Sequence, residues 1–160
     1  VVLDGGIFRG RGIEQGNYKW RAGVIGGFRI PAGSVVTIVE GGQKRIIGNR
    51  GIFSDIGDGR ISEGGYLNQG TVQIDGDMLA FSAQPGGSGD SFDSTGVIEK
   101  ISGTGTATIG MGAIGGFING GVVRSNEGRL AFDVGHMTIS NTQLDAHQGQ
   151  IAYFASMGVK

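Results

Sequence analysis

The sequence has no cysteine, only two prolines and one tryptophan, and no apolar run long enough to span a bilayer. The absence of cysteine excludes a disulfide framework, thiolate metal sites and redox motifs, so packing and hydrogen bonds must stabilise the chain. Leucine, glutamate and lysine are scarce as well, at 14 residues together, whereas isoleucine and valine number 18 and 12. Because β-branched residues favour strands over helices, this composition predicts β structure.

Charge of one sign is also lacking, since 13 basic and 14 acidic residues give a net charge of -1. This balance excludes the broad electrostatic footprint of a nucleic-acid or anionic-membrane binder. The charges are uneven along the chain: residues 1–60 hold nine basic and five acidic residues, and residues 61–160 hold four and nine. We expect no nucleic-acid partner and no membrane insertion, and opposite signs in the two parts of the chain.

Glycine is abundant, with 35 of the 160 residues. A glycine inside a strand or helix costs ~0.5–1 kcal/mol relative to alanine, so these residues belong in tight turns, bulges and close backbone contacts. The glycine-free stretches are short and alternate apolar with polar residues, as at 71–74 and 106–109. The sequence therefore predicts one all-β domain over residues 1–160, built from many short strands. We expect this domain to be a fragment or processed unit of a longer or polymeric assembly.

An internal repeat separates a stacked architecture from a sandwich. Gly64–Phe81 aligns without a gap on Gly115–Phe132, with eight identities in eighteen positions. This repeat predicts a right-handed parallel β-helix of roughly seven rungs, each ~17–26 residues long and rising ~4.8 Å. A β-sandwich or jelly roll resembling a pilin subunit is the alternative fold.

The stacked architecture makes specific predictions about side-chain direction. We expect four apolar side chains to point inward in register: Leu79, Phe81, Leu130 and Phe132. Alternation then places Ala80 and Ala131 on the other face. Asn68 and Asn119 are expected to form a corner ladder, in which their amides hydrogen-bond from rung to rung.

Three kinds of sequence unit, found in four segments, carry a family resemblance. Residues 18–35 contain a tryptophan followed by Gly-Gly and Ala-Gly, residues 67–72 and 117–122 share an asparagine-glycine-valine pattern, and residues 96–107 contain Glu-Lys followed by Gly-Thr-Gly-Thr. These units resemble the glycine-rich β-solenoid repeats of bacterial secreted and surface proteins, including autotransporter passengers. The resemblance covers about residues 17–135. It implies a right-handed parallel β-solenoid in an extracellular structural or adhesive protein, and it transfers no catalytic residue.

Two segments come close to metal-binding patterns. Gly86–Asp93 approaches the calcium-binding nonapeptide of β-rolls, but it occurs once and one residue is missing before Asp90, so a plain loop is the better interpretation. His136 and His147 have Asp133 and Asp145 nearby, yet their spacing is not that of a metal site. We therefore expect no metal and no cofactor, and we leave the role of residues 136–160 open.

The other polar candidates have simple structural interpretations. Four aspartates lie beside glycines, where we expect them to cap turns: Asp55, Asp58, Asp75 and Asp77. Thr104, Thr106 and Thr108 form one threonine strip of the kind found in ice-binding rods, but no neighbouring rung copies it. Because the acidic residues are scattered over turns, we predict no catalytic residue and no enzyme activity.

These observations lead to a functional expectation with two alternatives. The chain is expected to be a non-enzymatic extracellular or cell-surface module, structural or adhesive, that forms a filament, stalk or adhesin by end-to-end association with copies or neighbouring repeats. The first alternative is a glycan-binding or glycan-processing β-helix with a groove lined by Tyr18, Trp20 and paired carboxylates. The second is a pilin-like subunit that polymerises by strand exchange.

Overall fold

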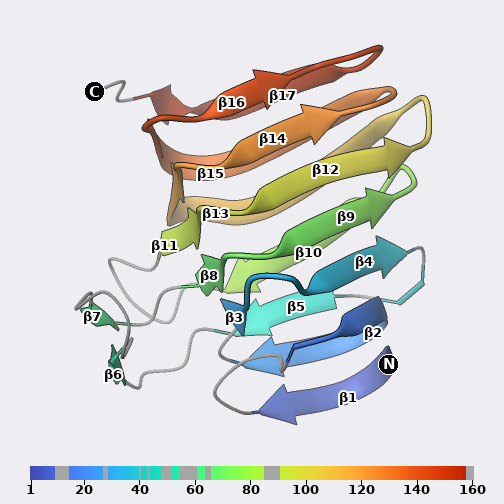
Figure 1. Ribbon diagram of the computed structural model, residues 1–160, viewed down its shortest axis with the longest axis vertical. Coiled ribbons are helices and arrows are strands. Elements are labelled where there is room, and N and C mark those ends of the chain that lie inside the picture. The colour runs from blue at the N-terminus through green and yellow to red at the C-terminus, as the bar shows by residue number, and fades with distance from the viewer. Residues whose placement is uncertain are drawn as a thin grey trace.

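The computed structural model describes residues 1–9, 15–26, 29–39, 41–42, 44–47, 52–54, 61–63, 66–84 and 91–157. Every element assigned in these ranges is a β-strand, which confirms the all-β prediction. The strands form a stack in which chain order follows the long axis, so that the first and last strands lie at opposite ends (Figure 1). These same ranges contain no helix long and apolar enough to cross a membrane.

Face A of the stack is a ladder of seven parallel strands. In order these are the first parts of β1 (Val2–Arg9) and β2 (Asn17–Gly26), then β4 (Val35–Val39), β9 (Thr71–Asp75), β12 (Val97–Ser102), β14 (Val122–Ser125) and β16 (Gln143–Asp145). One column of register partners contains Val2, Lys19, Thr37, Gln73, Glu99, Arg124 and Asp145. Five of the six intervals between these partners fall within the predicted 17–26 residues.

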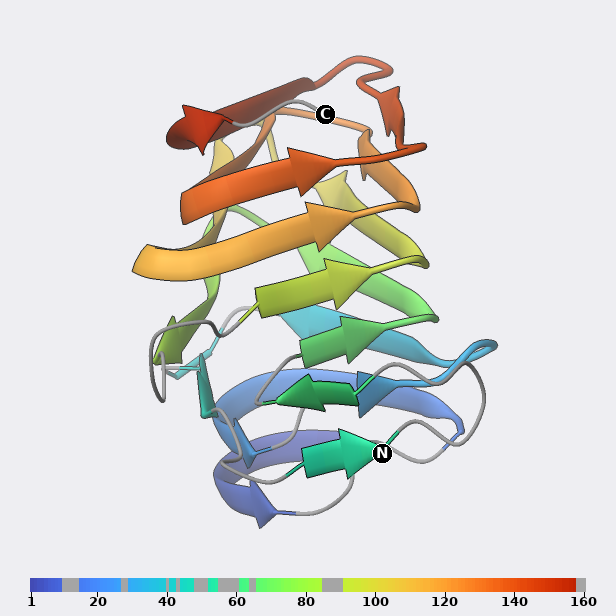
Figure 2. The same ribbon diagram turned by 90° about the vertical axis from the view of Figure 1, so that its left-hand side faces the viewer.

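Two further parallel ladders complete the stack. Face B contains the second parts of β1 and β2, followed by β5 (Lys44–Ile47), β10 (Leu79–Gln84) and the first parts of β13 (Thr106–Asn119), β15 (Arg129–Ile139) and β17 (Gln150–Met157). Face C contains β3 (Arg29–Ile30), β8 (Tyr66–Asn68), β11 (Ser91–Ser94) and the second parts of β13, β15 and β17. From Asn17 onward the chain visits faces A, B and C in that order, and we call each such passage a circuit. β1, which lies on faces A and B, counts as the first circuit, so β2 begins the second. Figure 2 shows strands of successive circuits one above another.

One short hairpin departs from this scheme. β6 (Ile52–Ser54) and β7 (Ile61–Glu63) pair antiparallel and lie beside the stack (Figure 1). They fall within the one long interval on face A, the 36 residues from Thr37 to Gln73. All other strand pairs in the described ranges are parallel. This pairing differs from the antiparallel sheets of a β-sandwich or jelly roll.

The core consists of columns of inward side chains. On face A buried and partly exposed residues alternate along β4 and β14 and through the first four residues of β9, as expected for a strand with one face inside. Val36, Val72, Ile98 and Val123 occupy successive positions of one column and are fully buried. On face B, Leu130 and Phe132 are buried as predicted. Like side chains therefore lie on like side chains along the axis.

The predicted inward position of Leu79 is wrong. Leu79 is 58% exposed, whereas Ala80, expected on the other face, is fully buried. The cause is a register shift: Leu79 pairs with Thr108 and Phe81 pairs with Ile109, so that three residues of β10 lie opposite two of β13. Such a bulge reverses side-chain direction locally. The prediction for Ala131 fails too, because that residue is 1% exposed; the Phe81 side chain lies outside the described part.

The predicted asparagine ladder has the right column but a different bonding pattern. Asn68 and Asn119 do share a column, yet Ser94 lies between them because the repeat of 51 residues covers two circuits. The Asn68 side-chain amide donates to the Ser94 hydroxyl at 3.1 Å and to the Val97 carbonyl at 3.1 Å. The corner is thus held by an amide and a hydroxyl in alternate circuits.

The final residues continue the stack although they depart from the repeat in sequence. Residues 136–139 complete face C of the sixth circuit, and β16 and β17 form the seventh. Asn141 lies at the corner between β15 and β16, with a φ of 54°. Asparagine tolerates this left-handed conformation better than most residues, so it can turn the chain without glycine.

Glycine is required at the corner that leads from face C to face A. Gly70, Gly96 and Gly121 follow one another there, and the Gly70 carbonyl accepts a hydrogen bond from Val97 N at 2.8 Å. A Cβ built on Gly96 would collide with the Gly70 carbonyl oxygen, and one on Gly121 with the Gly96 carbonyl oxygen. The close approach of successive circuits therefore excludes a side chain at this corner.

We expect Gly96→Ala to destabilise the protein by about 1–3 kcal/mol, the usual cost of forcing extra atoms into a packed site. Gly120→Ala is the matched control on the same corner, because its Cβ would meet only the Ser140 carbonyl oxygen, at 3.3 Å. We expect this control to stay within about 0.5 kcal/mol of wild type. Chemical denaturation of both variants measures the difference, and equal midpoints would contradict the steric account.

Candidate functional site

The most unusual group in the described part of the chain is the fully buried side chain of Lys100. Lys100 lies on β12 at an inward position, paired with Ile74 in the circuit before and with Ser125 in the circuit after. Lysine is almost never fully buried unless its charge is paired and hydrogen-bonded. The groups that pair with the Lys100 ammonium therefore need to be identified.

Oxygen atoms from three circuits surround the Lys100 ammonium. It donates hydrogen bonds to the main-chain carbonyl oxygens of Ser102 at 2.6 Å, Glu127 at 3.2 Å and Gly103. It also forms an ion pair with the Asp77 carboxylate at 3.0 Å. The single buried cation thus ties together the turns that follow β9, β12 and β14.

Asp77 supplies the opposite charge at this corner. Its carboxylate also accepts a hydrogen bond from the Gly105 amide at 2.8 Å, so it is held by both the turn and the lysine of the next circuit. The hydrogen bond from Lys100 and then that from Gly105 lower the pKa of Asp77 below its ordinary value of 3.8. A Cβ on Gly103 or Gly105 would run into this carboxylate, which explains both glycines.

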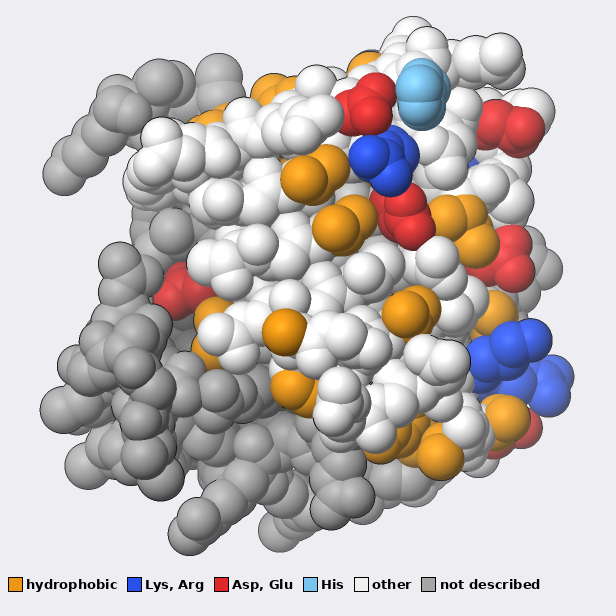
Figure 3. Space-filling view, viewed as in Figure 1, with side chains coloured by type: hydrophobic (Ala, Val, Ile, Leu, Met, Phe, Trp, Pro, Cys, Tyr) orange, Lys and Arg blue, Asp and Glu red, His pale blue; other side chains and the backbone are white. Residues whose placement is uncertain are grey.

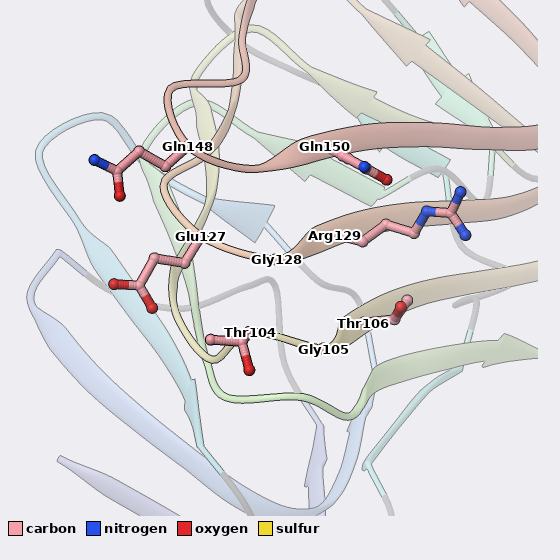
Figure 4. Close-up of a pocket in the computed structure, with 8 residues that line it drawn as sticks. All are labelled: Thr104, Gly105, Thr106, Glu127, Gly128, Arg129, Gln148 and Gln150. Carbon is pink, nitrogen blue, oxygen red and sulfur yellow. The ribbon is translucent and has the colours of Figure 1, made fainter.

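A hollow of about 740 Å³ opens on the surface beside this corner (Figure 4). Three successive circuits line it with polar side chains and two glycines: Thr104, Gly105, Thr106, Glu127, Gly128, Arg129, Gln148 and Gln150. Figure 4 shows two rows, in which Glu127 and Gln148 extend from the turns and Thr106, Arg129 and Gln150 lie at the starts of their strands. The second row is a single register column. Hydroxyl, amide, carboxylate and guanidinium groups here can hydrogen-bond a polar ligand.

A second polar feature runs up face A. Thr37 donates to the Gln73 side-chain oxygen at 3.1 Å, and the Gln73 amide donates to Glu99 at 2.9 Å. Arg124 then binds Glu99 at 3.4 Å and Asp145 at 3.0 Å. Acidic and basic side chains follow one another on this face in Figure 3. Five circuits are thus joined by one continuous chain of side-chain hydrogen bonds and ion pairs.

The residues of the two segments that come close to metal-binding patterns are spread over the described part or lie outside it. His147 is exposed and its Nδ1 lies 3.9 Å from Asp145, whereas Asp133 is exposed on β15. Over the described ranges no three His, Cys, Asp or Glu residues come together as a metal site. The His136 side chain and residues 85–90, which include Asp90, fall outside those ranges.

The predicted turn-capping aspartates bind the following circuit. Asp75 accepts a hydrogen bond from the Ser102 hydroxyl at 2.6 Å, and Asp77 binds Lys100 and Gly105. Their partners lie 23 to 28 residues further along the chain, so they connect circuits rather than close their own turns. Asp55 and Asp58 lie outside the described residues. The threonine strip at 104–108 continues as Arg129 and Ala131 in the next circuit, and so it is not copied there.

The aromatic groove suggested for a glycan-binding rod is not formed. Trp20 is fully buried on β2, and Tyr18 is partly buried against the core. Neither ring can therefore serve as the exposed stacking platform that the glycan alternative required. Among the described residues, the hollow beside Lys100 offers polar groups that can hydrogen-bond a saccharide.

Lys100 is not among the residues predicted from the sequence to form a site, although the alternating pattern of its strand places it inward. In Val97–Ser102 the alternating pattern places Ile98 inward, and the next inward position is Lys100. A charged residue at an inward position next to a Gly-Thr-Gly turn suggests a buried cation facing turn carbonyls. The partner Asp77 could not be found this way, because it lies one circuit earlier in the chain.

We expect Asp77→Asn to remove part of the acid sensitivity of the protein. Because the folded-state pKa of Asp77 lies below 3.8, its stabilising contribution is complete above that value and is lost as the pH falls through the lowered pKa. The gap in Tm between wild type and Asp77→Asn should therefore shrink as the pH is lowered from about 6 to about 3. Asp133→Asn, an exposed aspartate away from this corner, is the control. A gap that stays constant over this pH range would contradict the ion pair.

Comparison with known proteins adds no further assignment. No family model, curated protein or solved structure matches this chain. The site described above is therefore defined by the sequence and the geometry of the chain itself.

Proposed function

We propose that this chain is a right-handed parallel β-solenoid that serves as a structural or adhesive module outside the cell or on its surface. The repeated order of faces A, B and C supports a coil, and parallel strands joined by crossover connections are right-handed in about 98% of cases. The balanced composition and the side-chain ladder on face A support a scaffold rather than an enzyme. In this proposal the module is a building block of a filament, stalk or adhesin.

The observation that carries the proposal is the exposure of Leu144, the inward residue of the last described strand on face A. Leu144 continues the inward column of Val36, Val72, Ile98 and Val123, yet it is 48% exposed, whereas those four residues are fully buried. The difference arises because β16 has β14 below it and no described strand above it. The last described circuit therefore leaves an inward apolar position partly uncovered.

Neighbouring residues extend this apolar end. Ile151 and Tyr153 on β17 are partly buried against the core, and the Tyr153 ring stacks on Phe132 at 5.2 Å between ring centres. Burial raises the pKa of Tyr153 to about 12, so its hydroxyl stays uncharged at physiological pH. Apolar side chains at an end with open strand edges favour docking of another set of strands.

We assign this docking to the first circuit of a second copy. β1 and β16 are the outermost strands of the same parallel ladder, so a copy stacked head to tail continues the ladder in the same direction. Charge supports this arrangement, because basic residues are in excess over residues 1–60 and acidic residues over 61–160, and chain order follows the axis. Such a head-to-tail contact does not close on itself and so generates open filaments.

The test is a charge placed at the exposed end. Leu144→Glu should weaken self-association by at least about tenfold, because each chain then has to bury a charge to associate. Leu79→Glu is the matched control, since Leu79 is 58% exposed, somewhat more than Leu144, but lies on the side of the stack. Sedimentation velocity over a concentration series and electron microscopy measure the effect. A wild type that remains monomeric at high concentration and low salt, or equal loss in both variants, would overturn the proposal.

A second candidate function is saccharide binding in the hollow beside the Lys100 corner. It is favoured by the mixed hydroxyl, amide and guanidinium lining, which spans three circuits. Gln150→Ala should then reduce the signal of wild type on an array of neutral oligosaccharides, whereas Leu79→Glu should not. Absence of any array binding by wild type would remove this candidate and leave the structural proposal untouched.

A further inference from the structure

The oxygen atoms around Lys100 form a set that is not specific to an ammonium group. Three are main-chain carbonyl oxygens, of Ser102, Gly103 and Glu127, and the fourth belongs to the Asp77 carboxylate. An ammonium has only three protons to donate, so these four oxygens exceed its hydrogen-bonding capacity. The corner is better described as an oxygen-lined cation site than as the binding partner of one lysine.

The same donor set suits a calcium ion. Calcium takes six to eight oxygen ligands, drawn from carboxylates, main-chain carbonyls and water, in flexible geometry. The protein oxygens here come from the fourth, fifth and sixth circuits, and hydrogen bonds between circuits hold the turns that carry them. Magnesium demands a near-ideal octahedron and gives up its water reluctantly, so a cage of fixed carbonyl oxygens suits it less well.

We propose that these oxygens form a cation-binding site across three circuits, which Lys100 fills from within the chain and which accepts calcium once the ammonium is removed. Truncating the lysine side chain leaves room for the ion and for the water molecules that complete its shell. In the native chain the lysine makes this corner independent of dissolved calcium. The inference stands on the Lys100 contacts alone and does not depend on end-to-end association.

The experiment uses Lys100→Ala in the full chain, with calcium chloride as the probe. Without calcium, the variant is strongly destabilised or unfolded, because the Asp77 carboxylate and the turn carbonyls lose their shared partner. At about 5 mM calcium, above the 10⁻⁴–10⁻³ M range of weak protein sites, its Tm should rise by several degrees or its β circular dichroism should return. Chelation should reverse the change, and the response of wild type gives the baseline.

Two control variants make the result specific. Lys100→Met fills the space with an uncharged side chain, so it should be destabilised without gaining a calcium response. In Lys100→Ala combined with Asp77→Asn, the response should fall at least about tenfold in apparent calcium affinity, since the only carboxylate is gone. The proposal is overturned if Lys100→Ala stays unfolded or unshifted in calcium. It is overturned equally if Lys100→Met responds as strongly, or if sodium or magnesium alone gives the same shift.

Discussion

Each circuit approaches the next to the distance of a parallel β-ladder, about 4.8 Å, and this closeness determines which residues every column accepts. At the corner from face C to face A, the carbonyl oxygen of one glycine occupies the space that a side chain on the next would need, so Gly70, Gly96 and Gly121 recur. In the core, the same short spacing lets similar aliphatic side chains such as Val72 and Ile98 pack directly on one another. The many glycines at the corners and the many valines and isoleucines in the core thus both follow from the short distance between circuits.

Polar columns meet a further condition, because a parallel stack superposes side chains that lie far apart in sequence. Like charges in adjacent circuits repel, and opposite charges or hydrogen-bonding amides stabilise the ladder. On face A the order is Gln73, Glu99, Arg124 and Asp145, so each side chain forms a hydrogen bond or an ion pair with the next. In the same way the buried Lys100 meets the exposed Asp77, which pairs its charge at the surface.

The features that the sequence predicted are those set by the backbone. Strand content, circuit length and the shared columns of Asn68 with Asn119 and of Gly70 with Gly121 follow from glycine spacing and from the repeat. The position of Leu79 could not be predicted, because a single extra residue in β10 changes the face of a side chain without altering composition or period. The site at Lys100 depends on contacts between circuits, and no local pattern specifies which aspartate meets which lysine.

The two special places in this stack therefore differ in kind. At the Lys100 corner the polar groups of three circuits satisfy one another inside a single chain, so the sides of the stack need no further partner there. At Leu144 the repeating contact between circuits is interrupted, and the residue that would lie above it is missing from the described strands. A surface that reproduces the interior contact is best matched by another circuit of the same kind. Under our proposal, the interaction that folds the chain is therefore also the interaction that assembles it, and growth follows the axis along which the circuits stack.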